Sequence, residues 1–138
     1  MTTKDVIAQL LERGMAMQTF WGFYITVALG LVAFFGSAKR QKRLAFLMSL
    51  VFIGFAYVNF KGMVAVSTQR NFLYEVLGSI GPSTDPAPKA LDLQVASGIL
   101  ELAKPDTPEH LQYFHIGADC AVLLAIWILT LWQSHEKK

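Results

Sequence analysis

Three long apolar runs, nearly free of charge, constrain this chain more than any other feature. Residues 18–38 contain no charged side chain. At a helical rise of 1.5 Å per residue, a run of that length covers about 30 Å, the thickness of the hydrocarbon core of a bilayer. Residues 44–66 and 108–133 form the other two runs, interrupted only by Lys61, Glu109 and Asp119. The sequence therefore predicts an all-α integral membrane protein with three transmembrane helices.

Composition supports this class. Charged residues make up 16% of the 138 residues, whereas soluble domains carry about 25%. The net charge of +2 and the absence of a basic face with interleaved aromatics argue against nucleic acid as a partner. The length suits a single membrane domain in contact with the lipid bilayer.

The distribution of Lys and Arg predicts the orientation. The short loop after the first span is basic (Lys39, Arg40, Lys42 and Arg43), whereas residues 61–110 carry four basic and six acidic side chains. The positive-inside rule places this loop and the tail 134–138 in the cytoplasm and the N-terminus outside, as a multi-pass protein of the cell inner membrane. The first 17 residues are charge-balanced, which argues against a signal peptide.

The segments outside the spans also read as helical. Residues 1–17 form a short amphipathic helix, which either breaks from the first span at Gly14 or simply prolongs it. Residues 67–107 are predicted to be an external amphipathic helical hairpin. Apolar side chains recur every four residues on both sides of a turn rich in Pro and Gly. Asp106 or Thr107, followed by Pro108, caps the third span.

Asp119 is the strongest candidate for a functional residue. It lies about 12 Å along the third span at 1.5 Å per residue. An acid at such depth costs roughly 3 kcal/mol on insertion scales and faces a bundle interior or a wet cavity. Helical spacing aligns it with His115 and Gln112. The expected outward-facing polar cluster comprises Asp119, His115, Gln112, Asn59, Lys61 and Gln18.

Two interpretations of this cluster stay open. It can line a pathway for permeation, proton movement or a ligand, or it can join the helices by hydrogen bonds without any transport. In the second interpretation Asn59 or Lys61 is the partner of Asp119. Lys61 can also extend its side chain to the membrane surface and pair with nothing. The basic loop anchors the topology or, alternatively, binds anionic lipid heads.

Small and aromatic residues add two weaker signals. Glycines within the spans (Gly22, Gly30, Gly36, Gly54 and Gly117) are expected to allow close packing of helices within the chain. The many phenylalanines are most simply lipid-facing or packing groups, with a pigment or quinone pocket as the minor alternative.

No catalytic arrangement, phosphate-binding loop or two-histidine metal helix occurs, so we predict neither an enzyme nor a cofactor or metal site. The leading functional hypothesis is a small homo-oligomeric channel or transport-type protein with the polar cluster on its pathway. The alternative is a non-catalytic accessory or scaffold subunit of a larger membrane complex. A membrane enzyme with a metal or haem is the weakest option. A three-helix bundle has little interior of its own, so identical subunits or a larger complex are the expected partners.

Overall fold

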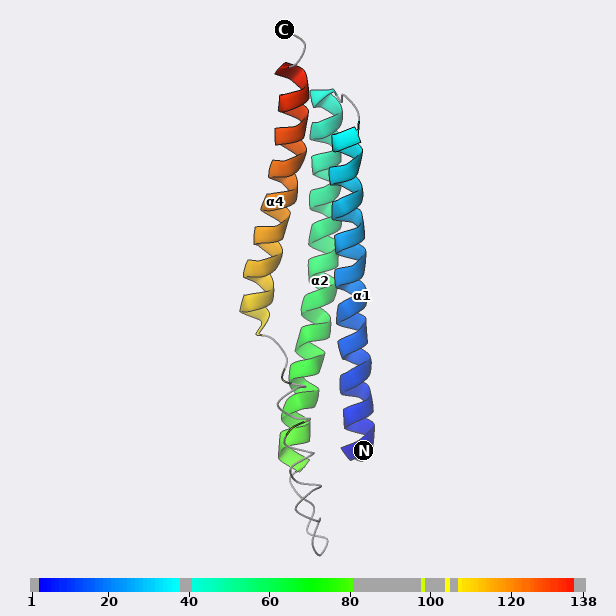
Figure 1. Ribbon diagram of the computed structural model, residues 1–138. Coiled ribbons are helices and arrows are strands. Elements are labelled where there is room, and N and C mark those ends of the chain that lie inside the picture. Colours follow the sequence, from blue (N-terminus) through cyan, green and yellow to red (C-terminus); the bar gives the residue numbers. More distant parts are fainter. Residues whose placement is uncertain (1–2, 38–40, 81–97, 99–103, 105–106, 136–138) are drawn as a thin grey trace, which may run out of the picture.

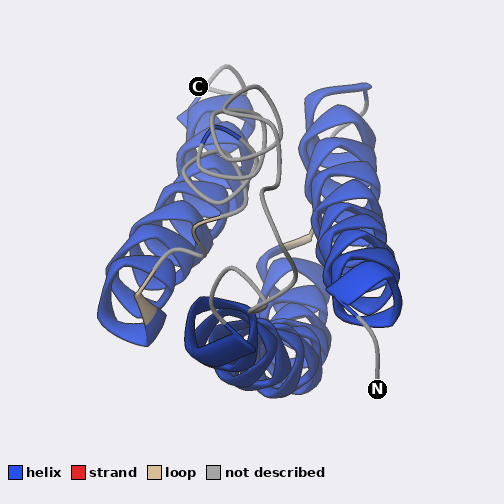
Figure 2. Cartoon of the chain, turned by 90° about the horizontal axis from the view of Figure 1, so that it is seen from below, coloured by secondary structure: helices blue, strands red, loops and turns tan. Residues whose placement is uncertain are grey.

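The computed structural model describes residues 3–37, 41–80, 98, 104 and 107–135. These residues form three long helices: α1 (Thr3–Ser37), α2 (Lys42–Ile80) and α4 (Pro108–His135). The helices lie side by side in an up-down-up arrangement, and Figure 2 shows them at three corners around a common centre. Each is long and apolar enough to cross a bilayer. The predicted all-α architecture with three such helices is confirmed.

α1 runs without a break through Gly14. Within the described residues, no break separates an N-terminal helix from the span, and residues 3–17 prolong the span. A glycine inside a helix costs only about 1 kcal/mol. Packing offsets that cost, because Val6 and Leu10 are buried against Leu73 of α2 in a separate apolar cluster.

α2 continues as a helix well past the apolar run, as the four-residue spacing predicted. Its 39 residues correspond to about 58 Å, and the 35 residues of α1 to about 52 Å, at 1.5 Å per residue. The N-terminal part of α1 and the C-terminal part of α2 consequently extend beyond α4 as a two-helix pair (Figure 1). Most of the rest of the predicted hairpin, residues 81–106, lies outside the described residues.

The start of α4 follows the predicted capping signal. Thr107 is the cap: its hydroxyl accepts a hydrogen bond from the amide of His110 at 3.3 Å, and its carbonyl accepts one from Leu111 at 3.2 Å. Pro108 occupies the first helical position, where a missing amide hydrogen costs nothing. α2 begins similarly, with the carbonyl of Gln41 accepting bonds from the amides of Leu44 and Ala45.

The main core joins all three helices. It contains Tyr24, Ala28, Leu31 and Phe35 from α1, Ala45, Phe52 and Ala56 from α2, and Ile126 from α4. Near Phe35 the helices are also tied by a polar contact, since the Gln133 side-chain amide donates to the Phe35 carbonyl at 2.7 Å. Towards its N-terminus, in contrast, α4 leans away from α2 (Figure 1).

Close approach between α1 and α2 depends on a glycine that the sequence did not single out. A Cβ atom on Gly62 would lie 2.5 Å from the Phe20 ring. The five glycines expected to pack within the chain have no such neighbour within 4 Å. That expectation was wrong, because the faces of the helices that carry those glycines turn away from the bundle.

Candidate functional site

Asp119 lies on α4, and both of its carboxylate oxygens are hydrogen-bonded within the chain. The Tyr24 hydroxyl of α1 donates to Oδ1 at 2.8 Å, and Nδ1 of His115 lies 2.9 Å from Oδ2. His115 precedes Asp119 by one helical turn, so the two side chains meet on one face of α4. We call Tyr24, His115 and Asp119 the polar triad. It links α1 to α4 at the level where the apolar core begins.

His115 is the most enclosed member of the polar triad. Its exposed fraction is 1%. Three aromatic rings surround it, with ring centroids 4.8 Å away for Tyr24, 5.3 Å for Phe60 and 6.0 Å for Trp21. Its Nε2 atom is buried and has no hydrogen-bond partner among the described residues. A buried polar atom without a partner is uncommon in native proteins and calls for an explanation.

A groove between α2 and α4 borders the polar triad. It has a volume of about 330 Å³, within the roughly 300–1,000 Å³ typical of small-molecule sites. One wall, from α4, carries a row of polar side chains at helical spacing: Gln112, His115 and Asp119. The facing wall, from α2, is apolar and largely aromatic, and its residues are Phe52, Ile53, Ala56, Tyr57 and Phe60. The side chain of Asp119 keeps 24% of its surface exposed.

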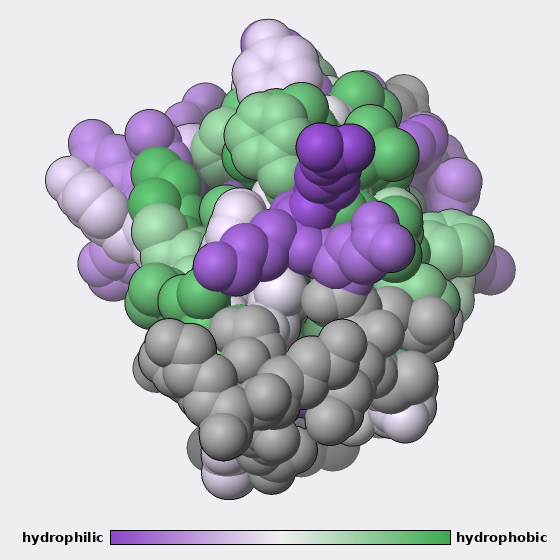
Figure 3. All heavy atoms as spheres, turned by 90° about the horizontal axis from the view of Figure 1, so that it is seen from above, coloured by the Kyte–Doolittle hydropathy of each residue, from purple (hydrophilic) through white to green (hydrophobic). Residues whose placement is uncertain are grey.

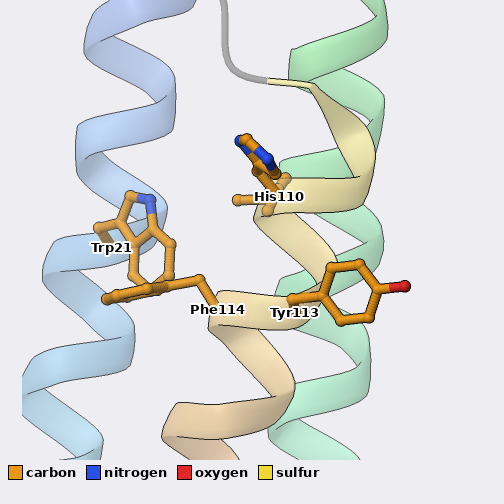
Figure 4. Close-up of a pocket in the computed structure, with 5 residues that line it drawn as sticks. Trp21, His110, Tyr113 and Phe114 are labelled. Atoms are coloured by element: carbon orange, nitrogen blue, oxygen red, sulfur yellow. The ribbon is translucent and has the colours of Figure 1, made fainter.

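A second hollow opens where α4 leans away. It has a volume of about 700 Å³ and is lined by Trp21 of α1 and by His110, Leu111, Tyr113 and Phe114 of α4. In Figure 4, Phe114 points towards Trp21, whereas Tyr113 points away from it. The Trp21 and Phe114 rings meet edge to face, with centroids 5.3 Å apart.

The structure gathers half of the predicted polar cluster. Asp119, His115 and Gln112 share the groove. Asn59 is buried elsewhere, where its amide donates to the Met63 sulfur at 3.4 Å. Lys61 and Gln18 are exposed. Asn59 and Lys61 therefore do not pair with Asp119 within the chain, since the Asn59 amide bonds Met63 on its own helix and Lys61 is exposed.

Two residues of the predicted basic loop, Lys42 and Arg43, lie in the first turn of α2, at the end of the bundle opposite the two-helix pair, and are exposed. The other two, Lys39 and Arg40, lie outside the described residues. Figure 3 looks onto this end and shows hydrophilic side chains near its centre with apolar ones beside them.

The sequence did not single out Tyr24 as a site residue, because an aromatic near the end of a span is typical of the membrane interface. The structure buries it to 3% exposure. A signal was available: Tyr24, Ala28, Leu31 and Phe35 follow helical spacing and form the buried face of α1. A tyrosine on a buried face needs a partner for its hydroxyl, and the carboxylate of Asp119 in the third span is an acceptor that could provide one.

Other chemistry finds no support in the described part of the chain. No three side chains of His, Cys, Asp or Glu come together there that could hold a metal. Cys120 is exposed on the surface of α4.

No protein-family model, curated protein or solved structure matches this chain. We therefore infer function from the geometry of the polar triad and its groove.

Proposed function

We propose that this chain is a three-span integral membrane protein of the channel or transport type, with the polar triad and Gln112 on its pathway. The observation that carries the proposal is Asp119, a partly exposed carboxylate halfway along an apolar helix, bonded to a buried imidazole. An acid at that depth is rarely retained without a role. An imidazole bonded to a carboxylate inside a membrane span is an arrangement typical of proton-linked pathways.

The exposed apolar surface supports the membrane setting. No more than 28% of the residues in any of the three apolar windows are buried within the chain. The remaining apolar surface far exceeds the few hundred Å² that a soluble monomer exposes. Lipid, identical subunits or a larger complex must cover it. In this proposal the basic end lies in the cytoplasm of the cell and the two-helix pair lies outside.

Flux through reconstituted protein tests the pathway. In proteoliposomes under a pH gradient, wild-type protein is expected to move protons or small cations. Asp119→Asn keeps the size of the side chain and removes its charge, so the magnitude or pH dependence of flux should change. Glu109→Gln is the matched control, because it removes the same charge from an exposed position in the first turn of α4. Flux that is equal in wild type, Asp119→Asn and Glu109→Gln would remove the polar triad from the pathway.

A non-catalytic accessory subunit is the second candidate, and a specific observation favours it. Both oxygens of Asp119 find partners in the same chain, so the polar triad can join α1 to α4 without carrying anything. In that case wild-type protein conducts nothing, and protein isolated in mild detergent co-purifies with other membrane subunits. Measuring the mass of the isolated particle separates this assembly from a homo-oligomer.

A further inference from the structure

In the neutral imidazole of His115, the groups around the ring make Nε2 the hydrogen-bond acceptor. An ionised carboxylate only accepts hydrogen bonds, and Asp119 already accepts one from the Tyr24 hydroxyl. The 2.9 Å contact between Asp119 and Nδ1 of His115 therefore places the ring proton on Nδ1, an assignment made from the bonding partner. Nε2 then carries a lone pair. It is the atom left buried and unpaired in the described structure.

The groove beside this lone pair has an asymmetric lining. Its polar groups form one row on α4, and its opposite wall is supplied by Phe52, Tyr57 and Phe60. A flat aromatic ring with a polar substituent on one edge matches both walls, stacking on α2 and bonding to α4.

The side chains at the mouth of the groove favour a lipid-soluble ligand. Ile53 and Tyr57 on α2 and Ile116 on α4 are large exposed side chains that also line the groove. They belong to the apolar surface that the proposed function places in lipid. A ligand that enters between them arrives from the bilayer and not from water.

We propose that this groove binds a membrane-soluble quinol, whose hydroxyl donates a hydrogen bond to Nε2 of His115 while its ring stacks on the aromatic wall of α2. Gln112, on the same row, is placed for the second oxygen of the ring. Because Nε2 is buried, a side chain of the wall must turn aside for the hydroxyl to reach it. We assign this movement to Phe60, whose ring packs on the imidazole. The proposal concerns reversible binding only and includes no electron transfer. It relies on the membrane placement within the proposed function but not on ion flux.

Binding can be followed through Trp21, whose ring centroid lies 6.0 Å from that of His115. Trp127→Phe with Trp132→Phe leaves Trp21 as the sole tryptophan among the three in the chain. The protein is placed in lipid nanodiscs under argon and titrated with decylubiquinol, with its dimethyl ether and with decylubiquinone. We expect saturable quenching by the quinol, with about tenfold weaker binding of the ether, which has no hydroxyl to satisfy the buried acceptor.

Asp119→Asn should reverse the preference of the groove for quinol over quinone, which a merely structural role of Asp119 would not do. The amide nitrogen of the new side chain donates to Nδ1, which moves the ring proton of His115 to Nε2. Nε2 then donates, so the quinone, which carries carbonyl acceptors, should bind more tightly than the quinol. Thr130→Val is the control: Thr130 is buried farther along α4 and bonds only the carbonyl of Ile126 in its own helix, so the preference for quinol should remain.

Equal affinity for quinol and ether in the wild type overturns the proposal, as does the absence of saturable quenching by either. His115→Phe removes the acceptor and should abolish saturable binding, and if that variant does not fold, the Asp119→Asn reversal decides alone. Failure of ion flux with intact quinol binding would reject the transport function and leave this site standing. Ion flux without quinol binding would support the transport function and reject this site.

Discussion

The bond from Tyr24 to Asp119 is the contact that most directly tests the described site. Tyr24→Phe removes only the hydroxyl and leaves the ring packed against Phe52 and His115. A hydrogen bond to a charged group contributes about 1.5–3 kcal/mol. Two features reduce this value. The Asp119 side chain is 24% exposed, so water or another donor can take the place of the hydroxyl. Side-chain bonds between membrane helices average about 0.6 and reach about 1.7 kcal/mol. We therefore expect a loss of about 1–1.7 kcal/mol in the free energy of unfolding.

The assay is reversible unfolding in mixed micelles with a rising fraction of sodium dodecyl sulfate, followed by circular dichroism. Tyr113→Phe is the matched control, because Tyr113 is 75% exposed and should change stability by less than about 0.5 kcal/mol. The double variant Tyr24→Phe with Asp119→Ala closes a thermodynamic cycle and isolates the pairwise energy. If Tyr24→Phe and Tyr113→Phe lower the free energy of unfolding equally, or the cycle shows no coupling, then the Tyr24 hydroxyl does not bond Asp119. Tyr24 would then not belong to the polar triad.

Two further predictions follow from the packing and the charge pattern. Gly62→Ala should destabilise the chain by about 1–2 kcal/mol in the same unfolding assay, despite a better helix former, because the new Cβ meets the Phe20 ring. Gly54→Ala, with nothing within 4 Å, should be neutral or stabilising by up to about 1 kcal/mol, and equal effects at both glycines would contradict the close approach. In a Cys120→Ala background, a membrane-impermeant thiol reagent applied to intact cells should label Ser79→Cys and not Gln41→Cys. The reverse pattern would invert the proposed topology.

Sequence reasoning works best here where a property is local. Apolar runs separated by charges identify the three helices, and Thr107 with Pro108 identifies where α4 begins. It fails where the answer depends on how one helix is rotated against another. Depth along the span suggested Asn59 and Lys61 as partners of Asp119, but Asn59 bonds Met63 within α2 and Lys61 is exposed. In a membrane span the lipid-facing and buried sides are both apolar, so the period that reveals the inner face of a soluble helix is weak.

The continuity of α1 shows a related limit. Gly14 read equally well as a break or as an internal residue, because its local cost is small. The helix continues through Gly14 because Val6 and Leu10 pack on Leu73, which lies more than sixty positions away in the chain. Nothing in the first twenty residues announces that partner. The same holds for Tyr24, whose role becomes visible only when α4 brings Asp119 to it.

The hydrogen bond from Gln133 to the Phe35 carbonyl provides a pivot about which α4 could tilt. It fastens one end of the helix to α1, while the other end leans outward (Figure 1). At 1.5 Å per residue, Asp119 lies about 21 Å from this pivot and Pro108 about 37 Å. A tilt of about 5° would therefore move Asp119 by about 1.8 Å but Pro108 by about 3.3 Å. A force applied near Pro108 would therefore act on the bond between Tyr24 and Asp119 with mechanical advantage, while Gln133 would move little.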